Sequence, residues 1–434
     1  MDHTLSIRYT AQMFKFLHAA DIHLDSPLRG LQRYEGAPAD EIRRATRHAL
    51  ENLVQLALDQ SVALVLIAGD LYDGDWRDHR TGLFFVSQMV RLREAGIRVV
   101  VIAGNHDAAN KMTRSLRLPD NVEMLDHRRP QTVVLDDPGV AVHGQSFATA
   151  AVMDDLSAGY PAAVGGMLNV GLLHTSANGR EGHLPYAPCT VEGLLAKQYD
   201  YWALGHAHRQ EVLHREPYVV FSGNIQGRHI RENGPKGCVL VHVDDQHRLR
   251  IEPRPLDVFR WEPCWVDAAG AESQTELLDR FRRQLTELVA GSDGLPMAVR
   301  VETSGPCPAH RQIAAQPQQW INELRAAALD VGGGRVWIEK VRTATSLPLD
   351  LDDAIASDGP VGELARLIEE LKSDPQSLGR MLDNEMAELK KKLPVELVEG
   401  PESFDPGRPE SAAGLLDEVR QMLVSQLGAR EADA

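Results

Sequence analysis

Five short stretches of the sequence place Asp, Asn or His side chains directly after an apolar run. The stretches are HAADIHLDS, IAGDLYDGD, IAGNHDAAN, GLLHTS and LGHAHRQ, and the candidates they supply are Asp21, His23, Asp70, Asn105, His106, Asp107, His174, His206 and His208. Each apolar run is typical of a buried strand, and ligands of open α/β sheets gather at the carboxyl ends of strands. One His after a strand is most often a structural residue. Five such stretches predict a shared site.

The residue types at this site favour a divalent metal. Carboxylates, imidazoles and one amide, without a thiolate, suit Mn, Fe, Zn or Mg rather than copper or an iron-sulfur cluster. Without His106 and Asp107, seven candidate ligands remain, more than one ion takes, whereas two ions bridged by Asp70 would each have about four. A metal pair about 3.5 to 4 Å apart stabilises the attacking and leaving oxygens in displacement at phosphorus. We therefore expect metal-dependent hydrolysis of a phosphoester.

The elements that must position these residues alternate between strands and helices. Strand patterns in FKFLHAA, ALVLIAGD, RVVVIAGN, MLNVGLLH and YDYWALGH are separated by helical patterns, among them residues 40–60 and 79–95. This alternation predicts a layered α/β domain. From about Asp257 the pattern becomes a smaller βαβαβ unit. It is followed by helical patterns at 361–372, 377–392 and 412–427, which we interpret as a partner-binding appendage.

Composition is typical of a soluble globular protein. The 434 residues suggest two or three domains, 43% of them are hydrophobic and 25% charged, and no uncharged apolar run is long enough for a membrane span. The N-terminus lacks the apolar region of a secretory signal. The chain has no CxxC pair, which argues against a zinc knuckle and a disulfide framework, and its four cysteines are Cys189, Cys238, Cys264 and Cys307. We expect a cytoplasmic protein.

The net charge of -16 would ordinarily argue against a nucleic-acid binder, because phosphate neutralisation needs Lys and Arg. The acidity is concentrated at the end of the chain, since residues 350–434 contain 20 acidic and 9 basic side chains. The charge of the remaining residues neither supports nor excludes a polyanionic substrate.

The ordered motifs DIH, GD, GNHD, LLHT and GHAH resemble the calcineurin-like metallophosphoesterase superfamily. Longer strings, FLHAADIHLDSPLRGL, GDLYDGDWRD, GREGHLPYAPC and SGNIQGRHIRE, look like the YhaO-type branch of the SbcD-like DNA repair exonucleases. The resemblance implies a layered β-sandwich flanked by helices, with a small α/β capping domain and a helical C-terminal appendage. The expected domains are a flexible extension, the dimetal phosphoesterase domain, the capping domain and an acidic helical region, at residues 1–12, 13–255, 256–345 and 346–434.

Carried over residue by residue, the resemblance implies two metal sites that share Asp70. One ion would be held by Asp21, His23, Asp70 and His208. The other would be held by Asp70, Asn105, His174 and His206. Mn²⁺ is the expected metal, with Fe, Zn or Mg as alternatives. His106 would stabilise charge on the scissile phosphate or protonate the leaving oxygen, and Asp107 would orient His106.

Some residues near the motifs have open roles. Archaeal and eukaryotic relatives carry a second histidine shortly after the GD motif, whereas this chain has Asp73, which either takes part or only braces the loop. His183, Arg228 and His229 lie in loops that either grip phosphates or are held by their own hydrogen bonds. Asp25 either pairs with His23 or caps a helix.

Three functions are compatible with these residues. The first, which we expect, is a Mn-dependent DNA exonuclease or endonuclease of repair type that works with an SMC-like coiled-coil ATPase bound by the C-terminal helices. The second is a phosphodiesterase or phosphatase for small nucleotides or phosphoproteins. The third is a non-catalytic scaffold, against which the complete set of ligand candidates argues. The oligomeric state stays open, with a homodimer among the alternatives.

Overall fold

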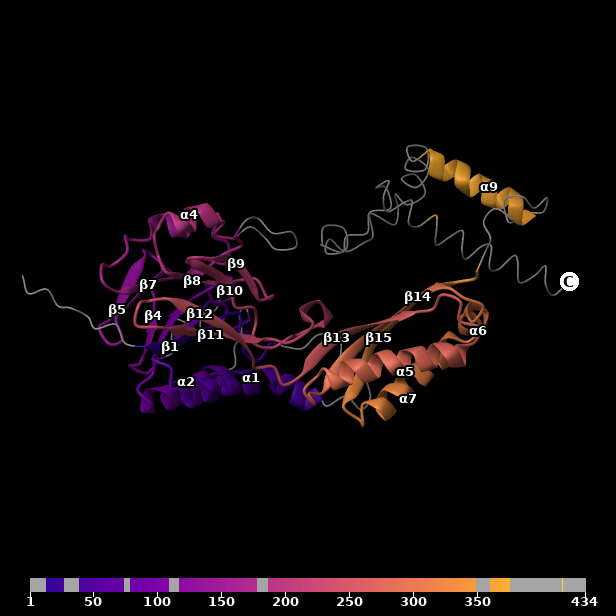
Figure 1. Ribbon diagram of the computed structural model, residues 1–434, viewed down its shortest axis with the longest axis horizontal. Coiled ribbons are helices and arrows are strands. Elements are labelled where there is room, and N and C mark those ends of the chain that lie inside the picture. Colours follow the sequence, from indigo (N-terminus) through magenta and orange to yellow (C-terminus); the bar gives the residue numbers. More distant parts are fainter. Residues whose placement is uncertain are drawn as a thin grey trace, which may run out of the picture. The chain divides into compact units, whose positions relative to one another are not determined.

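The computed structural model describes residues 13–26, 39–73, 79–108, 117–177, 186–348, 360–374 and 416. The chain divides into two compact units (Figure 1). The larger consists of residues 1–262 and 292–299, and the smaller of residues 263–291 and 300–434. Among the described residues, no helix has the length and apolar character needed to cross a membrane.

The first sheet of the larger unit has six strands in the order β12-β11-β1-β2-β3-β4. Strands β1 to β4 run parallel, whereas β11 and β12 pair antiparallel. The bounds are Phe14–Ala19 for β1, Leu64–Ala68 for β2, Arg98–Ile102 for β3, Val122–Met124 for β4, Gly237–Val243 for β11 and Leu249–Pro255 for β12.

The second sheet also has six strands, in the order β5-β6-β7-β8-β10-β9. Strands β6, β7, β8 and β10 are parallel, and β5 and β9 form antiparallel edges. The bounds are Gln131–Leu135 for β5, Val140–Gly144 for β6, Leu168–His174 for β7, Tyr201–Gly205 for β8, Glu211–Arg215 for β9 and Tyr218–Phe221 for β10.

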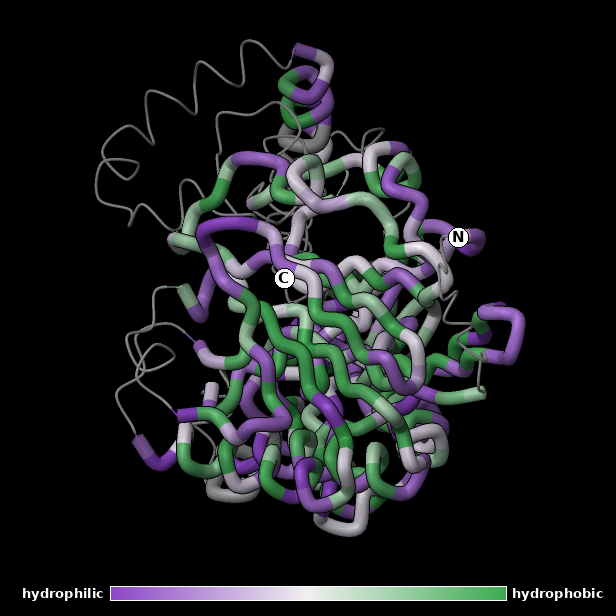
Figure 2. The backbone as a smooth tube through the Cα atoms, turned by 90° about the vertical axis from the view of Figure 1, so that its left-hand side faces the viewer, coloured by the Kyte–Doolittle hydropathy of each residue, from purple (hydrophilic) through white to green (hydrophobic). Residues whose placement is uncertain are grey.

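The two sheets pack face to face, and helices cover their outer faces. Leu66 of β2 and Val142 of β6 belong to one buried cluster between the sheets. Ile67 points the other way, toward helices α1 (Ala39–Asp59) and α2 (His79–Glu94). On the far side of the second sheet, Trp202 packs with Leu194 of α4 (Val191–Leu195). Because successive strand residues point to opposite faces and both faces are covered, central strands such as β2 and β8 are apolar throughout. Figure 2 shows hydrophobic stretches of backbone lying side by side.

A third sheet has three strands in the order β13-β14-β15, and all of it except the first residues of β13 and β14 belongs to the smaller unit. The strands are Arg260–Asp267, Met297–Pro306 and Val336–Ser346, and the connecting helices are α5 (Gln274–Ala290), α6 (His310–Ala315) and α7 (Pro317–Val331). Helix α5 begins at Ser273, whose hydroxyl accepts the backbone N–H of Glu276. Helix α9 (Pro360–Ser373) corresponds to the first predicted tail helix.

The predicted fold class, a layered sandwich flanked by helices with a smaller α/β unit, is confirmed by this architecture. The tail helices predicted at 377–392 and 412–427 lie outside the described residues, apart from Leu416. The domain borders expected at residues 255 and 345 stay predictions.

Candidate functional site

The predicted ligands lie on loops that follow five parallel strands, β1, β2, β3, β7 and β8. Hydrogen bonds join these loops across the two sheets. Both carboxylate oxygens of Asp21, after β1, accept the backbone N–H of His206, after β8, at 3.1 and 3.0 Å. Nε2 of His174, at the end of β7, lies 2.9 Å from Oδ1 of Asn105, after β3. The carboxyl ends of both sheets therefore meet at one site.

The loops reach each other because their backbone is unusual. Asp21, His23, Asp70 and His206 have positive φ angles of 50°, 45°, 53° and 98°. This left-handed region costs a non-glycine residue about 1 to 3 kcal/mol, and such residues cluster at functional sites. Gly69, before Asp70, has a φ of 92°, and a Cβ there would lie 2.5 Å from Nδ1 of His174. Only glycine fits between these loops.

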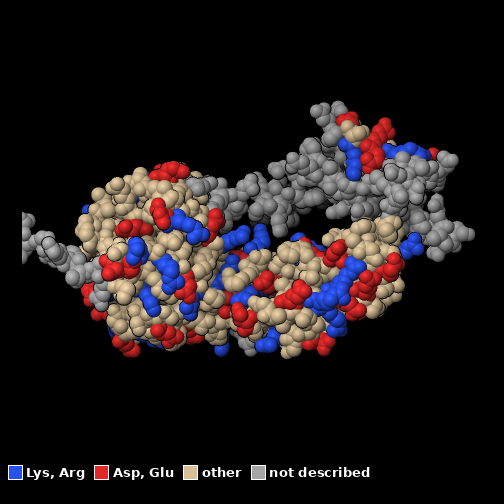
Figure 3. Space-filling view, viewed as in Figure 1, with Lys and Arg blue, Asp and Glu red and all other residues tan. Residues whose placement is uncertain are grey.

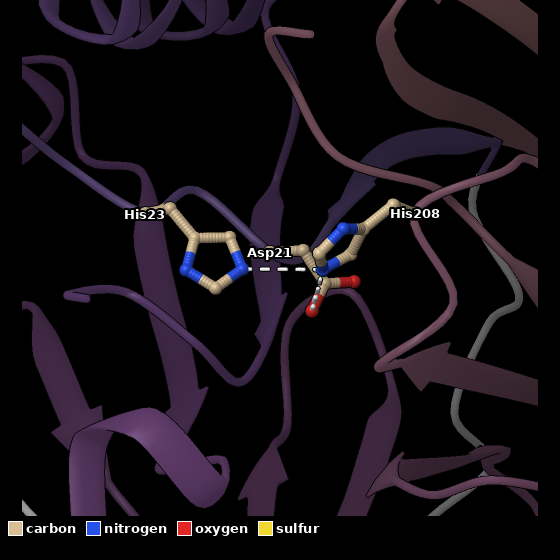
Figure 4. A group of neighbouring side chains, drawn as sticks. All are labelled: Asp21, His23 and His208. Carbon is tan, nitrogen blue, oxygen red and sulfur yellow. Dashed lines mark hydrogen bonds and ion pairs between the residues drawn. The ribbon is translucent and has the colours of Figure 1, made fainter. Parts of the chain in front are cut away.

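Asp21, His23 and His208 form one cluster of possible metal ligands, and their side chains point toward one another in Figure 4. Nε2 of His208 lies 3.2 Å from Nε2 of His23 and 3.9 Å from Oδ1 of Asp21. Two atoms bound to one ion at about 2.0 to 2.2 Å each lie about 3 Å apart. The separations between these ligand atoms are therefore close to those between atoms that share one ion.

A second cluster surrounds Asp70. Oδ2 of Asp70 lies 3.5 Å from Nε2 of His174 and 3.9 Å from Nε2 of His23, so this carboxylate stands between the two groups of ligands. Nδ1 of His174 donates to the carbonyl of Ala68 at 2.9 Å. The lone pair of the neutral ring is therefore on Nε2, which faces Asn105. Burial lowers the pKa of His174 to about 4, so its ring is neutral near pH 7.

These residues fit a divalent cation. The lone pairs of His174 Nε2 and Asn105 Oδ1 face each other at 2.9 Å, and a cation bound to both would turn this repulsion into coordination. Burial, followed by the charge of Asp70, raises the pKa of Asp21 well above its usual range. A bound dication would reverse that shift, because it stabilises both carboxylates. The ring of His206 lies 5.2 Å from that of His174, outside the tightest groups of ligand atoms among the described residues.

His106 lies beside the ligands and is held by Asp73. Its Nδ1 is 3.0 Å from Oδ1 of Asp73, and its side chain is 40% exposed. The hydrogen bond that His106 donates to Asp73 raises the pKa of His106. Ser26 donates to the other oxygen of Asp73 at 2.7 Å. Asp73 thus does more than brace its loop, because it fixes the ring of His106.

Asp107 has a different place from the one expected. Its carboxylate accepts the backbone N–H groups of Leu71 at 3.0 Å, Tyr72 at 2.9 Å and Gly104 at 3.1 Å. The prediction that Asp107 orients His106 is therefore corrected, since Asp73 makes that contact. Asp107 instead ties the loop after β2 to the loop after β3.

Two families of known proteins match separate parts of this chain. Residues 14–210 match the family model described as calcineurin-like phosphoesterase, and residues 261–346 match the middle domain of metallophosphoesterase YhaO. An uncharacterized metallophosphoesterase YhaO of Bacillus subtilis is 34% identical over 319 residues, which cover 73% of this chain and 75% of that protein. The chain is a calcineurin-like metallophosphoesterase.

More distant relatives of this metallophosphoesterase are named as DNA repair proteins. The DNA double-strand break repair protein Mre11 of Methanopyrus kandleri is 25% identical over 411 residues, 84% of each chain. The Mre11 protein of Haloferax volcanii is 27% identical over 288 residues, 63% of this chain and 58% of its own. A solved dimetal phosphatase from Danio rerio is 14% identical with a TM-score of 0.37 over 56% of this chain and 96% of its own, too low to bear on function.

The metallophosphoesterase site also contains a residue that sequence reasoning missed. Glu232, in the string SGNIQGRHIRE, lies 2.7 Å from Nδ1 of His208 through its Oε1. Its neighbour Arg228 reaches the same oxygen at 2.9 Å and lies 3.9 Å from Asp73. Nε2 of His229 lies 3.5 Å from Glu232. Arg228 and His229 thus border the site, and the available signal was that this string is one of those that carry the family resemblance.

The remaining open residues of the metallophosphoesterase have structural partners or lie outside the description. Asp25 pairs with Arg47 at 2.6 and 2.5 Å and accepts the hydroxyl of Thr81, so among the described residues its carboxylate contacts these side chains rather than His23. Residues 27–38 lie outside the described residues, so the helix-cap alternative stays a prediction. His143, which the motifs leave out of the metal site, bonds Thr132 and Asn169. His183 lies outside the described residues.

Proposed function

We propose that this metallophosphoesterase is a Mn²⁺-dependent nuclease that hydrolyses phosphodiester bonds of DNA. The observation that carries the proposal is the half-exposed His106–Asp73 pair beside two clusters of possible metal ligands, one of Asp21, His23 and His208 and one of Asp21, Asp70 and His174. The choice of DNA draws on the archaeal Mre11 relative, which aligns over 84% of this chain. Exonuclease and endonuclease action both fit the site.

Two ions would share Asp70 in this proposal. The first ligand set is Asp21, His23, Asp70 and His208, and the second is Asp70, Asn105, His174 and His206. When bound, such a pair supplies positive charge for the attacking and leaving oxygens. The support is the position of Asp70, which lies 3.9 Å from His23 in one set and 3.5 Å from His174 in the other.

His106 would act on the substrate directly. The side chain of His106 is 40% exposed, against 21% for that of His208, so an approaching phosphodiester would meet the ring of His106. Asp73 holds Nδ1, so Nε2 is directed away from the carboxylate and can donate a proton to the scissile phosphate or the leaving oxygen. Arg228 lies near enough to Asp73, at 3.9 Å, to add positive charge to the same side.

The C-terminal helices would bind an SMC-like coiled-coil ATPase. Within the part of the tail that the structure describes, α9 exposes Leu367 at 52% while Ile368 is buried, so apolar surface is available for a partner. Deleting residues 350–434 should abolish ATPase binding and spare hydrolysis of a small phosphodiester. Loss of diester hydrolysis together with ATPase binding would contradict this division of labour. A capping role for the smaller unit, a homodimer and a cytoplasmic location belong to the same proposal.

A small-molecule phosphodiesterase is the second candidate function. Over the described residues of the face drawn in Figure 3, Lys and Arg are intermixed with Asp and Glu, and no broad basic track stands out. This mixture fits a small diester as well as a polynucleotide.

One experiment separates the two functions. The purified full chain with Mn²⁺ is incubated with end-labelled single- and double-stranded DNA and, in parallel, with bis(p-nitrophenyl) phosphate. A nuclease cleaves both the DNA and the small diester, and chelation stops both reactions. Turnover of the small diester with intact DNA would favour the second candidate and overturn the first.

A further inference from the structure

Glu232 lies behind His208, on the side of the ring that faces away from the other ligands. It ends the short helix η2 (Ile230–Glu232), and its side chain is only 4% exposed. Oε1 of Glu232 lies 2.7 Å from Nδ1 of His208. Oε2 accepts the side-chain amide of Asn224 at 2.9 Å and the backbone N–H of Arg228 at 2.8 Å. A buried carboxylate is thus fixed by its own loop and directed at one imidazole.

This contact determines which nitrogen of His208 carries the proton. A carboxylate only accepts hydrogen bonds, so Nδ1 at 2.7 Å must be the donor. The guanidinium of Arg228 lies 3.2 Å from the same nitrogen, but both groups are drawn to Oε1 of Glu232 and neither accepts from the other. The neutral ring then has its lone pair on Nε2, the atom that lies 3.2 Å from His23 and 3.9 Å from Asp21.

His174 is held in the same tautomer by a weaker acceptor. Its Nδ1 donates to the backbone carbonyl of Ala68 at 2.9 Å, whereas His208 donates to a charged carboxylate. A carboxylate acceptor makes the ligating nitrogen of the imidazole more basic than a carbonyl acceptor does, because its negative charge raises the electron density of the ring. The two halves of the site are therefore supported differently, and Glu232 serves only one of them.

We infer that Glu232 is a positioning residue of the metal centre, which fixes the tautomer and ring plane of His208 and so strengthens the ion held with Asp21 and His23. The inference rests on the proposed function in one respect, that a cation binds at these residues. Glu232 touches neither the cation nor the substrate. It also holds Arg228, whose guanidinium lies 3.9 Å from Asp73, and so links the loop after β10 to the carboxylate that orients His106.

The first test examines the tautomer of the wild-type chain and needs no variant of Glu232. Histidine is labelled with ¹⁵N, and long-range ¹H–¹⁵N correlation spectra are recorded on the metal-free full chain, with His208→Asn assigning the resonance. The expected result is a neutral His208 ring protonated at Nδ1. A ring protonated at Nε2, or an average of both tautomers, would overturn the inference.

The second test measures binding of Mn²⁺ alone to the full chain by calorimetry. In Glu232→Gln, one of the two sites should lose about 10- to 100-fold in affinity, the range for a lost carboxylate behind a histidine ligand, while the other changes little. The matched control is Glu252→Gln. Glu252 makes the same kind of carboxylate–histidine contact, with His242 at 3.2 Å on β11 and β12, and its loss should leave both affinities unchanged.

The outcomes separate a positioning role from a merely structural one. If Glu232 only closes its loop through Asn224 and Arg228, the variant lowers the unfolding midpoint and leaves the affinity ratio of the two sites as in the wild type. That result overturns the inference. If Glu232→Gln does not fold, the tautomer of the wild type still decides. If the wild type binds no Mn²⁺, the proposed function fails, whereas the tautomer measurement still tests Glu232.

Discussion

Oδ1 of Asp73 lies 3.0 Å from Nδ1 of His106, and this pair places a half-exposed imidazole beside the predicted metal ligands. The hydrogen bond with His106 holds the pKa of Asp73 well below its usual range. The same bond raises the pKa of His106 against the opposing effect of burial. The ring of His106 also stands 5.0 Å from the ring of His23, edge to face. An imidazole whose protonated form is favoured by the Asp73 carboxylate therefore lies next to the predicted metal ligands.

Replacing His106 should separate catalysis from metal binding. In His106→Ala, the Mn²⁺ content should stay near that of the wild type, because none of the proposed ligands is changed. Turnover of a phosphodiester should fall by about 10² to 10⁴, the usual contribution of a general acid. The exposed His127 gives a control, since His127→Ala should keep full activity. Wild-type turnover in His106→Ala would remove the assigned role.

Asp107 and Asp73 should differ in what their loss does. Asp107→Asn places an amide N–H against backbone donors that now bond the carboxylate, so the free energy of unfolding should drop by about 1 to 3 kcal/mol. Asp73→Asn should lower turnover with a smaller loss of stability, since Asp73 is partly exposed. Urea denaturation and diester turnover of both variants decide the matter. The reverse ranking of stabilities would show that the two carboxylates have been assigned wrongly.

Asp70 is a proposed metal ligand, and its carboxylate should lower the stability of the chain when no metal is bound. Its buried carboxylate is close to that of Asp21, and after burial itself this charge is the next cause that raises the pKa of Asp21. Asp70→Asn can still accept the backbone N–H of His106, a bond of 3.0 Å in the wild type, yet it removes this repulsion. Without metal, the variant should unfold at a higher temperature than the wild type, and with Mn²⁺ the order should reverse. Retention of two ions per chain by the variant would speak against a shared ligand.

His18 should make the larger unit sensitive to mild acid. It is fully buried between the hydroxyl of Tyr201 at 3.0 Å and the carbonyl of Leu204 at 3.2 Å, and burial lowers its pKa from 6.5 to about 3. The unfolded chain takes up this proton near pH 6.5 and the folded chain near pH 3. Stability from the neutral ring is therefore complete above pH 6.5 and declines as the pH falls toward 3, by about 4 to 5 kcal/mol at most.

The measurement for His18 is the change in urea midpoint of the metal-free chain between pH 7 and pH 5. His18→Gln should reduce this difference in urea midpoint, because glutamine takes up no proton. His127→Gln should leave it as in the wild type, since His127 is 44% exposed. An unaltered pH dependence in His18→Gln would contradict the assignment.

The fold was predictable from the sequence where strands are buried on both faces. Strands β2 and β8 are apolar at every position, so their runs stand out in the chain. The edge strand β12 was not predicted, because its exposed and half-buried residues alternate irregularly and include Glu252 and Arg254. Strand β4 has only three residues and offers too short a pattern. Central strands can be predicted from their apolar composition. The formation of an edge strand depends on a partner strand elsewhere in the chain, so it cannot be predicted in this way.

The candidate site was predictable in its members but not in all its contacts. Polar residues that follow neighbouring parallel strands of one sheet lie at the same edge, which is why Asp21 and Asp70, after β1 and β2, could be expected together. The pairing of His106 with Asp107 was wrong because successive residues of the helical turn α3 (Asn105–Ala108) point about 100° apart. Glu232 was missed because it contacts His208 from a loop 24 residues away, which no periodicity announces.

The shared role of Asp70 is the central claim, and anomalous scattering from crystals soaked in Mn²⁺ tests it most directly. The account predicts two peaks per chain about 3.5 to 4 Å apart. One should contact Asp21, His23 and His208, the other Asn105, His174 and His206, and the carboxylate of Asp70 should contact both. A single peak, or two peaks of which only one touches Asp70, would contradict the account.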